Sequence, residues 1–187
     1  MQKNRILIIT GDAGESLEVL YAKQRFLEDG YLPVIAAPQV KALNLVIHDF
    51  EPGWDTYIER KGYYVTADID LDQALKEEFI AILCIGGRAP EYLRHDARVI
   101  KLVQTFYAQG KHVWAICHGV QILVTAGILT GKKITCYEHV QSDVTGCGGH
   151  YIPDKQAVQD GKIITGQTWQ SHPAFYRLVM QSLKSLT

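Results

Sequence analysis

The sequence lacks most of the features that mark secreted, membrane or nucleic-acid-binding proteins. Its four cysteines form no Cys-x-x-Cys pair and have no zinc-like spacing, so we expect four free thiols. The apolar run that begins near Arg5 ends at Thr10, which is too short for a signal h-region or a membrane span. The 19 basic and 20 acidic side chains are scattered, and the net charge is −1. We therefore expect a cytoplasmic protein with no membrane partner and no nucleic-acid site.

The sequence also lacks the common cofactor motifs. It has no Gly-x-Gly-x-x-Gly fingerprint for a dinucleotide. A metal site in the stretch Gly146 to His150 would need further ligands that the sequence does not offer. We accordingly expect no cofactor and no metal. There is no linker, repeat or low-complexity segment in the 187 residues, which predicts one domain over residues 1–187.

The periodicity of apolar residues predicts strands that alternate with helices. We expect strands at residues 5–10, 32–36, 62–67, 81–85, 112–116, 133–137, 157–160 and 162–165. We expect helices from Ser16 to the stop at Gly30, and at 71–78, 96–109, 120–126 and 173–186, with a loop at 49–60. This alternation predicts an α/β fold with a doubly wound, mostly parallel sheet. Ligands of such sheets bind at the carboxyl ends of the strands.

The most informative residues are Ala115-Ile116-Cys117-His118-Gly119, which lie between a predicted buried strand and a predicted helix. A cysteine at this sharp turn has the position of a nucleophile elbow. Free backbone N–H groups at a helix start favour the thiolate, so we expect a lowered thiol pKa and covalent chemistry at Cys117. A small buried core residue is the alternative reading of the same cysteine. Cys84, Cys136 and Cys147 have no comparable setting.

Backbone donors for an oxyanion are expected close to this turn. The N–H of His118 follows the nucleophile and would supply one donor, and Gly86-Gly87 after the central strand would supply the other. Gly86-Gly87 is equally compatible with a simple turn. The His118 side chain either converges on the cleft with Cys117 or lies exposed at the helix start.

Two carboxylates and a histidine complete the set of candidates. Glu15 follows the first strand and Glu91 follows Pro90, and both are also typical of carboxylates that stabilise a helix dipole. His48, in Ile47-His48-Asp49-Phe50-Glu51, either lines a pocket or caps a loop. Glu59 is expected to be a surface residue.

The segments Gly86 to Leu93 and Ile116 to Leu123 resemble the two main signatures of the ThiJ/PfpI superfamily, which includes the Parkinson disease protein 7-like proteins. The resemblance covers nearly the whole chain. It is strongest to the archaeal PfpI intracellular protease type and to the repeated halves of plant glyoxalase-type members, which share the segment from Ile47 to Tyr57. Val120 departs from the Pro or Gln that is frequent in close relatives.

This resemblance implies a flavodoxin-like three-layer sandwich, as in class I glutamine amidotransferases, and a reactive Cys117. It implies that Glu15 hydrogen-bonds the cysteine and acts as acid or base, with His118 as catalytic partner. It further implies that Glu91 reaches His118 from a neighbouring subunit of a homo-oligomer. Gly87 and His118 would form the oxyanion hole, and Gly86, Arg88 and His48 would line the substrate pocket.

Three functions are compatible with these residues. The first is a glutathione-independent glyoxalase or deglycase, in which Cys117 attacks an aldehyde such as methylglyoxal or a glycated protein or nucleotide. The second is a cysteine peptidase or amidase with a Cys117–His118–Glu91 triad across a subunit contact. The third is a stress chaperone or redox sensor, in which Cys117 is oxidised to a sulfinate.

Overall fold

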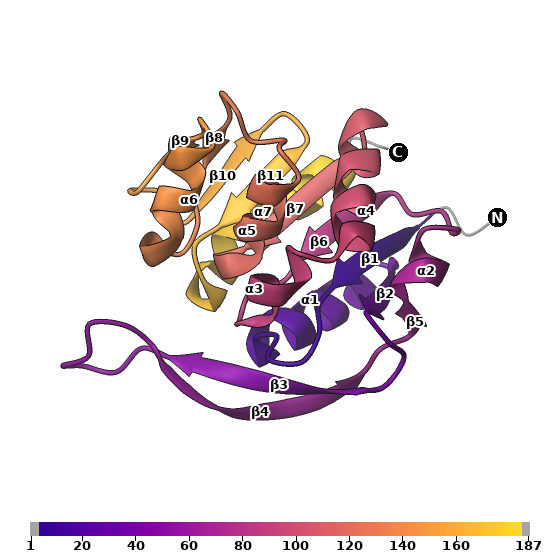
Figure 1. Cartoon of the computed structure of the whole chain (residues 1–187), viewed down its shortest axis with the longest axis horizontal. Coiled ribbons are helices and arrows are strands. Elements are labelled where there is room, and N and C mark those ends of the chain that lie inside the picture. The colour runs from indigo at the N-terminus through magenta and orange to yellow at the C-terminus, as the bar shows by residue number, and fades with distance from the viewer. Residues whose placement is uncertain (1–3, 185–187) are drawn as a thin grey trace.

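The structure is a computed structural model that describes residues 4–184, and it is built around a seven-stranded sheet (Figure 1). The strand order is β10-β11-β7-β6-β1-β2-β5. All neighbours pair in parallel except β10, which runs antiparallel to β11. The strands are β1 (Arg5–Ile9), β2 (Leu32–Ala37), β5 (Ile69–Asp70), β6 (Ala81–Cys84), β7 (His112–Ile116), β10 (Ala157–Asp160) and β11 (Ile163–Gly166). The expected mostly parallel α/β sheet is confirmed.

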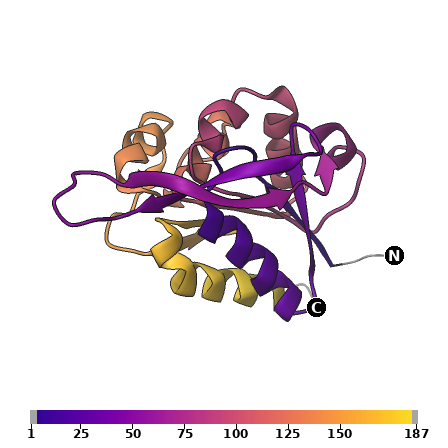
Figure 2. The same ribbon diagram turned by 90° about the horizontal axis from the view of Figure 1, so that it is seen from below.

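Helices cover both faces of the sheet and complete three layers. Figure 2 shows α1 (Ser16–Glu28) and α7 (His172–Lys184) side by side on one face, although they come from opposite ends of the chain. The opposite face carries α3 (Ala89–Leu93), α4 (Ala97–Ala108) and α5 (Val120–Thr125), with α2 (Leu71–Ala74) near β5. Two-sided coverage explains why the central strands are continuous apolar runs and not alternating ones.

The core lies between the central strands and α1, α4 and α7. Ile6 to Ile9 of β1 and Ala81 to Cys84 of β6 are fully buried. Trp114 of β7 is the largest fully buried side chain, and its ring lies 5.9 Å from the ring of Phe26 of α1. This contact fixes the first helix against the strand that ends at the candidate nucleophile.

A long hairpin lies outside the main sheet. It consists of β3 (Ala42–Asp49) and β4 (Ile58–Thr66), which pair antiparallel, and its tip extends beyond the body of the molecule (Figure 1). The prediction of a loop at 49–60 is therefore wrong in part, and the strand predicted at 62–67 begins earlier. β3 was not predicted, because its pairing is with β4 and with Glu15 through a single bridge, and such partners are not readable from local sequence.

The remaining differences concern short elements. The expected helix at 71–78 ends at Ala74, and the expected strand at 133–137 is limited to β8 (Lys133–Ile134), which pairs with β9 (His150–Tyr151). Helix α6 (Gln141–Gly146) was not predicted. The last helix begins at His172, one residue before the predicted start, and the end predicted for it at Leu186 lies outside the described residues.

Candidate active site

Cys117 lies at the turn from β7 into α5, in the single helical turn η1 (Cys117–Gly119). Its φ angle is 57°, in the left-handed region that non-glycine residues rarely adopt. Such backbone strain persists only where the surrounding structure enforces it, and it is typical of nucleophile elbows. The side chain is 4% exposed and lies at the carboxyl edge of the parallel sheet.

Two backbone N–H groups and one imidazole surround the thiol. The N–H groups of His118 and Gly87 hydrogen-bond the sulfur and favour the thiolate. The Nδ1 atom of His118 lies 3.3 Å from Cys117 Sγ. The structure thus brings together three of the residues that the sequence singled out, and the two expected oxyanion donors converge on one atom.

The carboxylate beside the thiol belongs to Glu18 and not to Glu15. Glu18 is fully buried, its Oε2 accepts a hydrogen bond of 2.7 Å from the Gly86 N–H, and its carboxyl group hydrogen-bonds the Cys117 thiol. Oε1 of Glu18 has no hydrogen-bond partner within residues 4–184. The hydrogen bond that the family resemblance implied for Glu15 is therefore made one helical turn later.

Glu15 instead starts the helix that carries Glu18. Its Oε2 accepts a hydrogen bond of 2.8 Å from the Glu18 N–H, which makes Glu15 the N-cap of α1 in place of the predicted Ser16. The His48 N–H also donates to the Glu15 carboxylate. Glu18 is the functional candidate that sequence reasoning missed. Its place three residues after a capping carboxylate was the available signal.

Burial dominates the electrostatics of this cluster. It raises the pKa of Glu18 well above its usual range, and the neighbouring Glu15 charge raises it further. Burial likewise raises the pKa of Glu15 to about 7. For Cys117, burial and then an ionised Glu18 raise the thiol pKa, against the two backbone donors that lower it. The prediction of a lowered thiol pKa is wrong, because desolvation outweighs the helix start.

His118 is a neutral base at physiological pH. Burial lowers its pKa to about 4. Its ring lies 5.1 Å from the ring of Tyr137, 5.8 Å from that of Tyr57 and 6.3 Å from that of His48. These rings come from the hairpin and from the segment before α6, and they pack around the imidazole of His118. A neutral Nδ1 at 3.3 Å from sulfur can accept the thiol proton.

The expected pocket residues His48 and Arg88 are joined through Glu59. The His48 Nε2 lies 3.1 Å from Glu59 Oε2, and Arg88 donates two hydrogen bonds of 2.6 and 2.8 Å to the same carboxylate. The His48 ring also stacks on Tyr57 at 3.8 Å. Glu59 is exposed, as expected, and its carboxylate links the side chains of His48 and Arg88.

Gly86 lies where only a hydrogen atom fits. A Cβ built on it would lie 2.6 Å from Cys117 Cβ and 2.8 Å from Glu18 Oε2. Gly87, with φ of 77°, has the left-handed conformation that turns its N–H toward the sulfur. The two glycines therefore allow close approach of the backbone to the thiol.

Glu91 lies in the first turn of α3 and is exposed. Within residues 4–184, no hydrogen bond joins it to His118. The role that the resemblance implies for Glu91, across a subunit contact, stays a prediction.

The other three thiols lie in different surroundings. Cys84 and Cys136 are buried, and burial raises the pKa of Cys136 to about 12. Cys147 is half-buried, and its Sγ donates to the Val144 carbonyl at 3.2 Å. All four cysteines are free, as expected. Among the described residues, no group of three or more His, Cys, Asp or Glu side chains is placed to hold a metal ion.

The helices were compared with the length and hydrophobicity that a membrane span requires. Between residues 4 and 184, no helix is both long enough and apolar enough to span a bilayer.

Comparison with known proteins gives a consistent result. The family model for the DJ-1/PfpI family matches residues 4–182. Among curated relatives, the chain is 36% identical to Protein DJ-1 homolog D of Arabidopsis thaliana over 96% of this chain but only 47% of that protein. It is 32% identical to Deglycase PH1704 of Pyrococcus horikoshii, over 96% of this chain and 99% of the relative. The chain thus spans about half of the plant protein and nearly all of the archaeal one.

Solved structures show the same fold. A ThiJ/PfpI domain protein from Brachyspira murdochii superposes with a TM-score of 0.84 at 24% identity and covers 100% of both chains. Drosophila melanogaster DJ-1beta superposes with a TM-score of 0.83 at 20% identity, over 97% of this chain and 90% of that one.

Proposed function

Given that the chain belongs to the DJ-1/PfpI family, we propose that it is a glutathione-independent, cysteine-dependent enzyme of the glyoxalase and deglycase type. Its substrates would be small reactive aldehydes such as methylglyoxal, or the early adducts that these form on amines. Relatives that carry the name deglycase support the enzyme class. The observation that carries the proposal is the buried thiol of Cys117 among the Glu18 carboxyl group, the His118 imidazole and two backbone donors.

The first step is addition of the thiol to the aldehyde. His118 Nδ1 accepts the thiol proton while Sγ forms a bond to C1 of methylglyoxal. The electron pair of the C=O bond moves to oxygen, where the N–H groups of Gly87 and His118 stabilise the developing charge. Glu18, which is protonated because of its raised pKa, gives its proton to that oxygen and leaves a hemithioacetal.

The second step moves hydrogen from C1 to C2. The Glu18 carboxylate takes the C1 proton, the electron pair forms a C1=C2 bond, and the C2 oxygen receives the proton held by His118. Glu18 then returns its proton to C2 and the C1 hydroxyl loses its own to Glu18. The product is a lactoyl thioester of Cys117. Water hydrolyses the C1–S bond and releases lactate and the thiol, so the sum is methylglyoxal plus water to lactate.

The same first step serves a deglycase. An early adduct of methylglyoxal on an amine keeps a carbon at the aldehyde oxidation level, which is open to attack by Cys117 with loss of the amine. The resulting hemithioacetal is identical, so one thiol and one proton carrier support both reactions.

The enclosure of the thiol favours small substrates. Cys117 is 4% exposed, and the rings of Tyr57 and Tyr137 lie 5.8 and 5.1 Å from the ring of its neighbour His118. An extended peptide would need a groove along its backbone, whereas a three-carbon dicarbonyl fits a narrow opening. This supports glyoxalase and deglycase chemistry over peptide cleavage.

The test is glutathione-free turnover of methylglyoxal by purified protein, with lactate as the measured product. We expect turnover by the wild type, none by Cys117→Ala, and full turnover by Cys147→Ala as the matched control. A fluorogenic peptide in a parallel assay tests cleavage. Equal loss of methylglyoxal with wild type and Cys117→Ala, or dominant peptide cleavage, would refute the proposal.

A further inference from the structure

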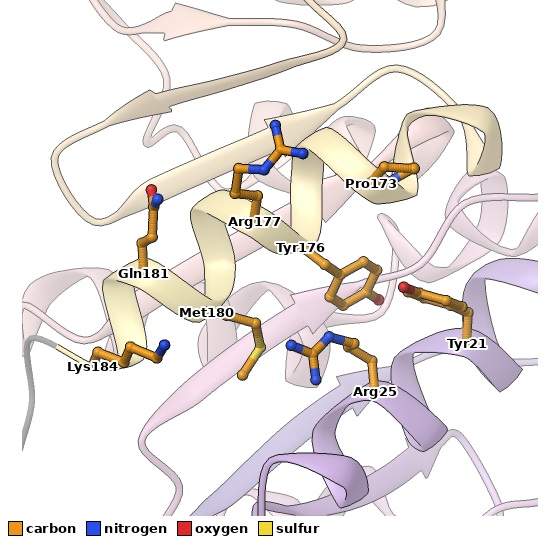
Figure 3. Close-up of a pocket in the computed structure, with 8 residues that line it drawn as sticks. All are labelled: Tyr21, Arg25, Pro173, Tyr176, Arg177, Met180, Gln181 and Lys184. Carbon is orange, nitrogen blue, oxygen red and sulfur yellow. The ribbon is translucent and has the colours of Figure 1, made fainter.

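Cations line a hollow between α1 and α7, but they do not act together. Figure 3 shows Arg177 of α7 directed away from Arg25 of α1. Arg25 is already paired with Asp29 at 2.7 Å. The hollow therefore presents no group of cations to a charged molecule.

An ion pair beside the candidate active site has a better defined geometry, and it joins the loop after β6 to the hairpin. Arg88 donates hydrogen bonds of 2.6 Å from Nε and 2.8 Å from Nη2 to the two carboxylate oxygens of Glu59 on β4. Two parallel hydrogen bonds of this kind hold a guanidinium and a carboxylate strongly and in one orientation. We call these two side chains the Arg88–Glu59 pair. None of the steps proposed at Cys117 uses it.

The pair is connected to the neighbours of the thiol on two sides. On one side, Arg88 directly follows Gly87, whose backbone N–H hydrogen-bonds the thiol sulfur. On the other side, Oε2 of Glu59 lies 3.1 Å from Nε2 of His48. The His48 ring in turn lies 6.3 Å from the ring of His118. The charges of the pair therefore lie close to the groups proposed to act on the substrate.

The pair is also open to solvent and held in place. The side chain of Arg88 is 48% exposed and that of Glu59 is 31% exposed. The backbone N–H of Arg88 donates a hydrogen bond of 2.8 Å to the Ala13 carbonyl, and Gly87 forms a β-bridge with Gly14. A charged molecule that approaches the thiol from solvent therefore meets a cation and an anion at a fixed place.

Glu59 compensates the positive charge of Arg88. The hydrogen bonds from Arg88 hold the pKa of Glu59 below its usual value, so Glu59 is ionised at neutral pH. A further carboxylate, Glu91, interacts electrostatically with both Arg88 and His48. An arginine is the usual partner of a substrate carboxylate, but here its guanidinium is already occupied. An anionic substrate therefore finds no uncompensated cation in this part of the site.

We propose that the Arg88–Glu59 pair determines which charge the substrate carries. Because Glu59 occupies the guanidinium of Arg88, the site takes neutral carbonyl compounds such as methylglyoxal in preference to anionic ones such as glyoxylate. This inference rests on the function proposed for the same site and names its substrate class as uncharged aldehydes. Neither residue of the pair transfers a proton or forms a covalent bond, and both act through their charge alone.

The test uses two thiol reagents of nearly the same size, neutral iodoacetamide and anionic iodoacetate. Mass spectrometry gives their rates of reaction with Cys117 at low ionic strength, and the ratio of the iodoacetate rate to the iodoacetamide rate is compared among variants. Both reagents react with the same thiolate, so a change in the thiol pKa alters both rates equally and leaves the ratio unchanged. The measurement needs no turnover, and its result is therefore independent of the reaction proposed above.

The two single variants should shift the ratio in opposite directions. Glu59→Gln leaves the guanidinium uncompensated, so the ratio should rise at least about fivefold. Arg88→Gln leaves the carboxylate uncompensated, so the ratio should fall at least about threefold. The double variant lacks both charges and should return to within about twofold of the wild type. Added KCl should reduce both shifts, because salt screens exposed charges.

Lys111→Gln and Glu78→Gln are the matched controls. These residues form an ion pair of 3.0 Å and precede β7 and β6, so they lie at the amino edge of the sheet, opposite Cys117. Neither control should change the ratio. In the wild type and Glu59→Gln, glyoxylate is also tested as an inhibitor of methylglyoxal turnover, and it should inhibit the variant more strongly by a similar factor.

Circular dichroism reports whether each variant folds. The same ratio in folded Glu59→Gln, Arg88→Gln and wild-type proteins would overturn the proposal. Shifts of the two single variants in the same direction would also overturn it, because they would report a structural change and not a charge. If neither reagent labelled Cys117 in any of these proteins, the pair could not select solutes at the thiol and the proposal would be wrong. The expected opposite shifts without methylglyoxal turnover would support the charge preference and refute only the reaction.

Discussion

The carboxyl group of Glu18 and the thiol of Cys117 form a buried hydrogen-bonded pair, although they come from the first helix and from the turn after β7, the fifth strand of the main sheet along the chain. The Gly86 N–H holds the other side of the carboxyl group at 2.7 Å. Because burial raises the pKa of both groups, each favours its neutral form at neutral pH. The pair therefore holds protons that it can exchange with a substrate.

The first prediction separates the two carboxylates of α1. Glu18→Gln should lower kcat/KM for methylglyoxal by about 10²–10⁴-fold, the usual contribution of a general acid–base group. Glu15→Gln replaces the charged acceptor of a helix cap by a neutral one and should chiefly lower stability, by up to about 1 kcal/mol. Steady-state kinetics and urea unfolding measure the two effects.

Glu78→Gln is the matched control, since Glu78 is exposed and forms an ion pair with Lys111 far from the thiol in sequence and fold. Glu59 is unsuitable because of its bonds to Arg88 and His48. A larger kinetic loss in Glu15→Gln than in Glu18→Gln would return the acid–base role to Glu15.

The second prediction concerns thiol reactivity. Cys117 should react with limiting iodoacetamide before Cys84 and Cys136, because it alone of these buried thiols has two backbone donors and a neutral imidazole at the sulfur. Since its pKa is raised, the labelling rate should still be rising above pH 8.5. Mass spectrometry of tryptic peptides gives the rates. A rate that levels off below pH 7 would contradict the burial argument.

The third prediction concerns the close approach at Gly86. Gly86→Ala would place a methyl group 2.6 Å from Cys117 Cβ and 2.8 Å from Glu18 Oε2. Overpacking of this kind costs about 1–3 kcal/mol of stability, and displacement of the pair should lower turnover more than tenfold. Gly146→Ala, where an added Cβ meets no atom within 4 Å, should keep wild-type activity. Normal turnover in folded Gly86→Ala would show that the pair tolerates displacement.

The fourth prediction follows from a buried histidine at the start of β7. Burial lowers the pKa of His112 to about 4, below its usual value of 6.5. The unfolded chain therefore binds a proton at a higher pH than the folded chain, and stability falls as pH drops from 6.5 to 4. His112→Gln should escape this loss, up to about 3 kcal/mol for a shift of this size. The comparison is between the variant and the wild type by urea unfolding at pH 7 and pH 4.5.

His95→Gln, at an exposed histidine, is the control and should follow the wild type over this range. The pKa of Glu15 is raised to about 7, so its protonation stabilises the folded chain as the pH falls. This contribution is the same in all three proteins and cancels when their stabilities are compared. If the free energies of unfolding of His112→Gln and the wild type differ by the same amount at pH 7 and pH 4.5, the lowered pKa of His112 is contradicted.

The fifth prediction concerns assembly. We expect a dimer or larger oligomer by light scattering at micromolar concentration, because the family resemblance places Glu91 of one subunit against His118 of another. If so, a mixture of Glu91→Gln and Cys117→Ala proteins should regain part of the activity that each lacks, since one mixed site has both residues. A monomer would remove any triad across subunits and would weaken the peptidase alternative most.

The parallel sheet, the elbow and the family could be predicted from the amino-acid sequence. Continuous apolar strands, helical periodicity and the turn residues around Cys117 are local signals, and the structure confirms the α/β sheet that they predict. The expectation that His118 and Gly87 meet at the thiol also came from the sequence, because both follow strands that end at the same edge.

Which carboxylate meets the thiol depends on how distant segments pack together. Glu15 and Glu18 are one helical turn apart, and only the docking of α1 on the sheet, through contacts such as Phe26 on Trp114, selects between them. The same packing makes burial outweigh the helix start in the pKa of Cys117. The hairpin that brings the His48 ring to 6.3 Å from the His118 ring consists of two strands outside the main sheet. These contacts and pKa shifts arise because segments distant in sequence bury one another. The local sequence of each segment does not show which partner will bury it.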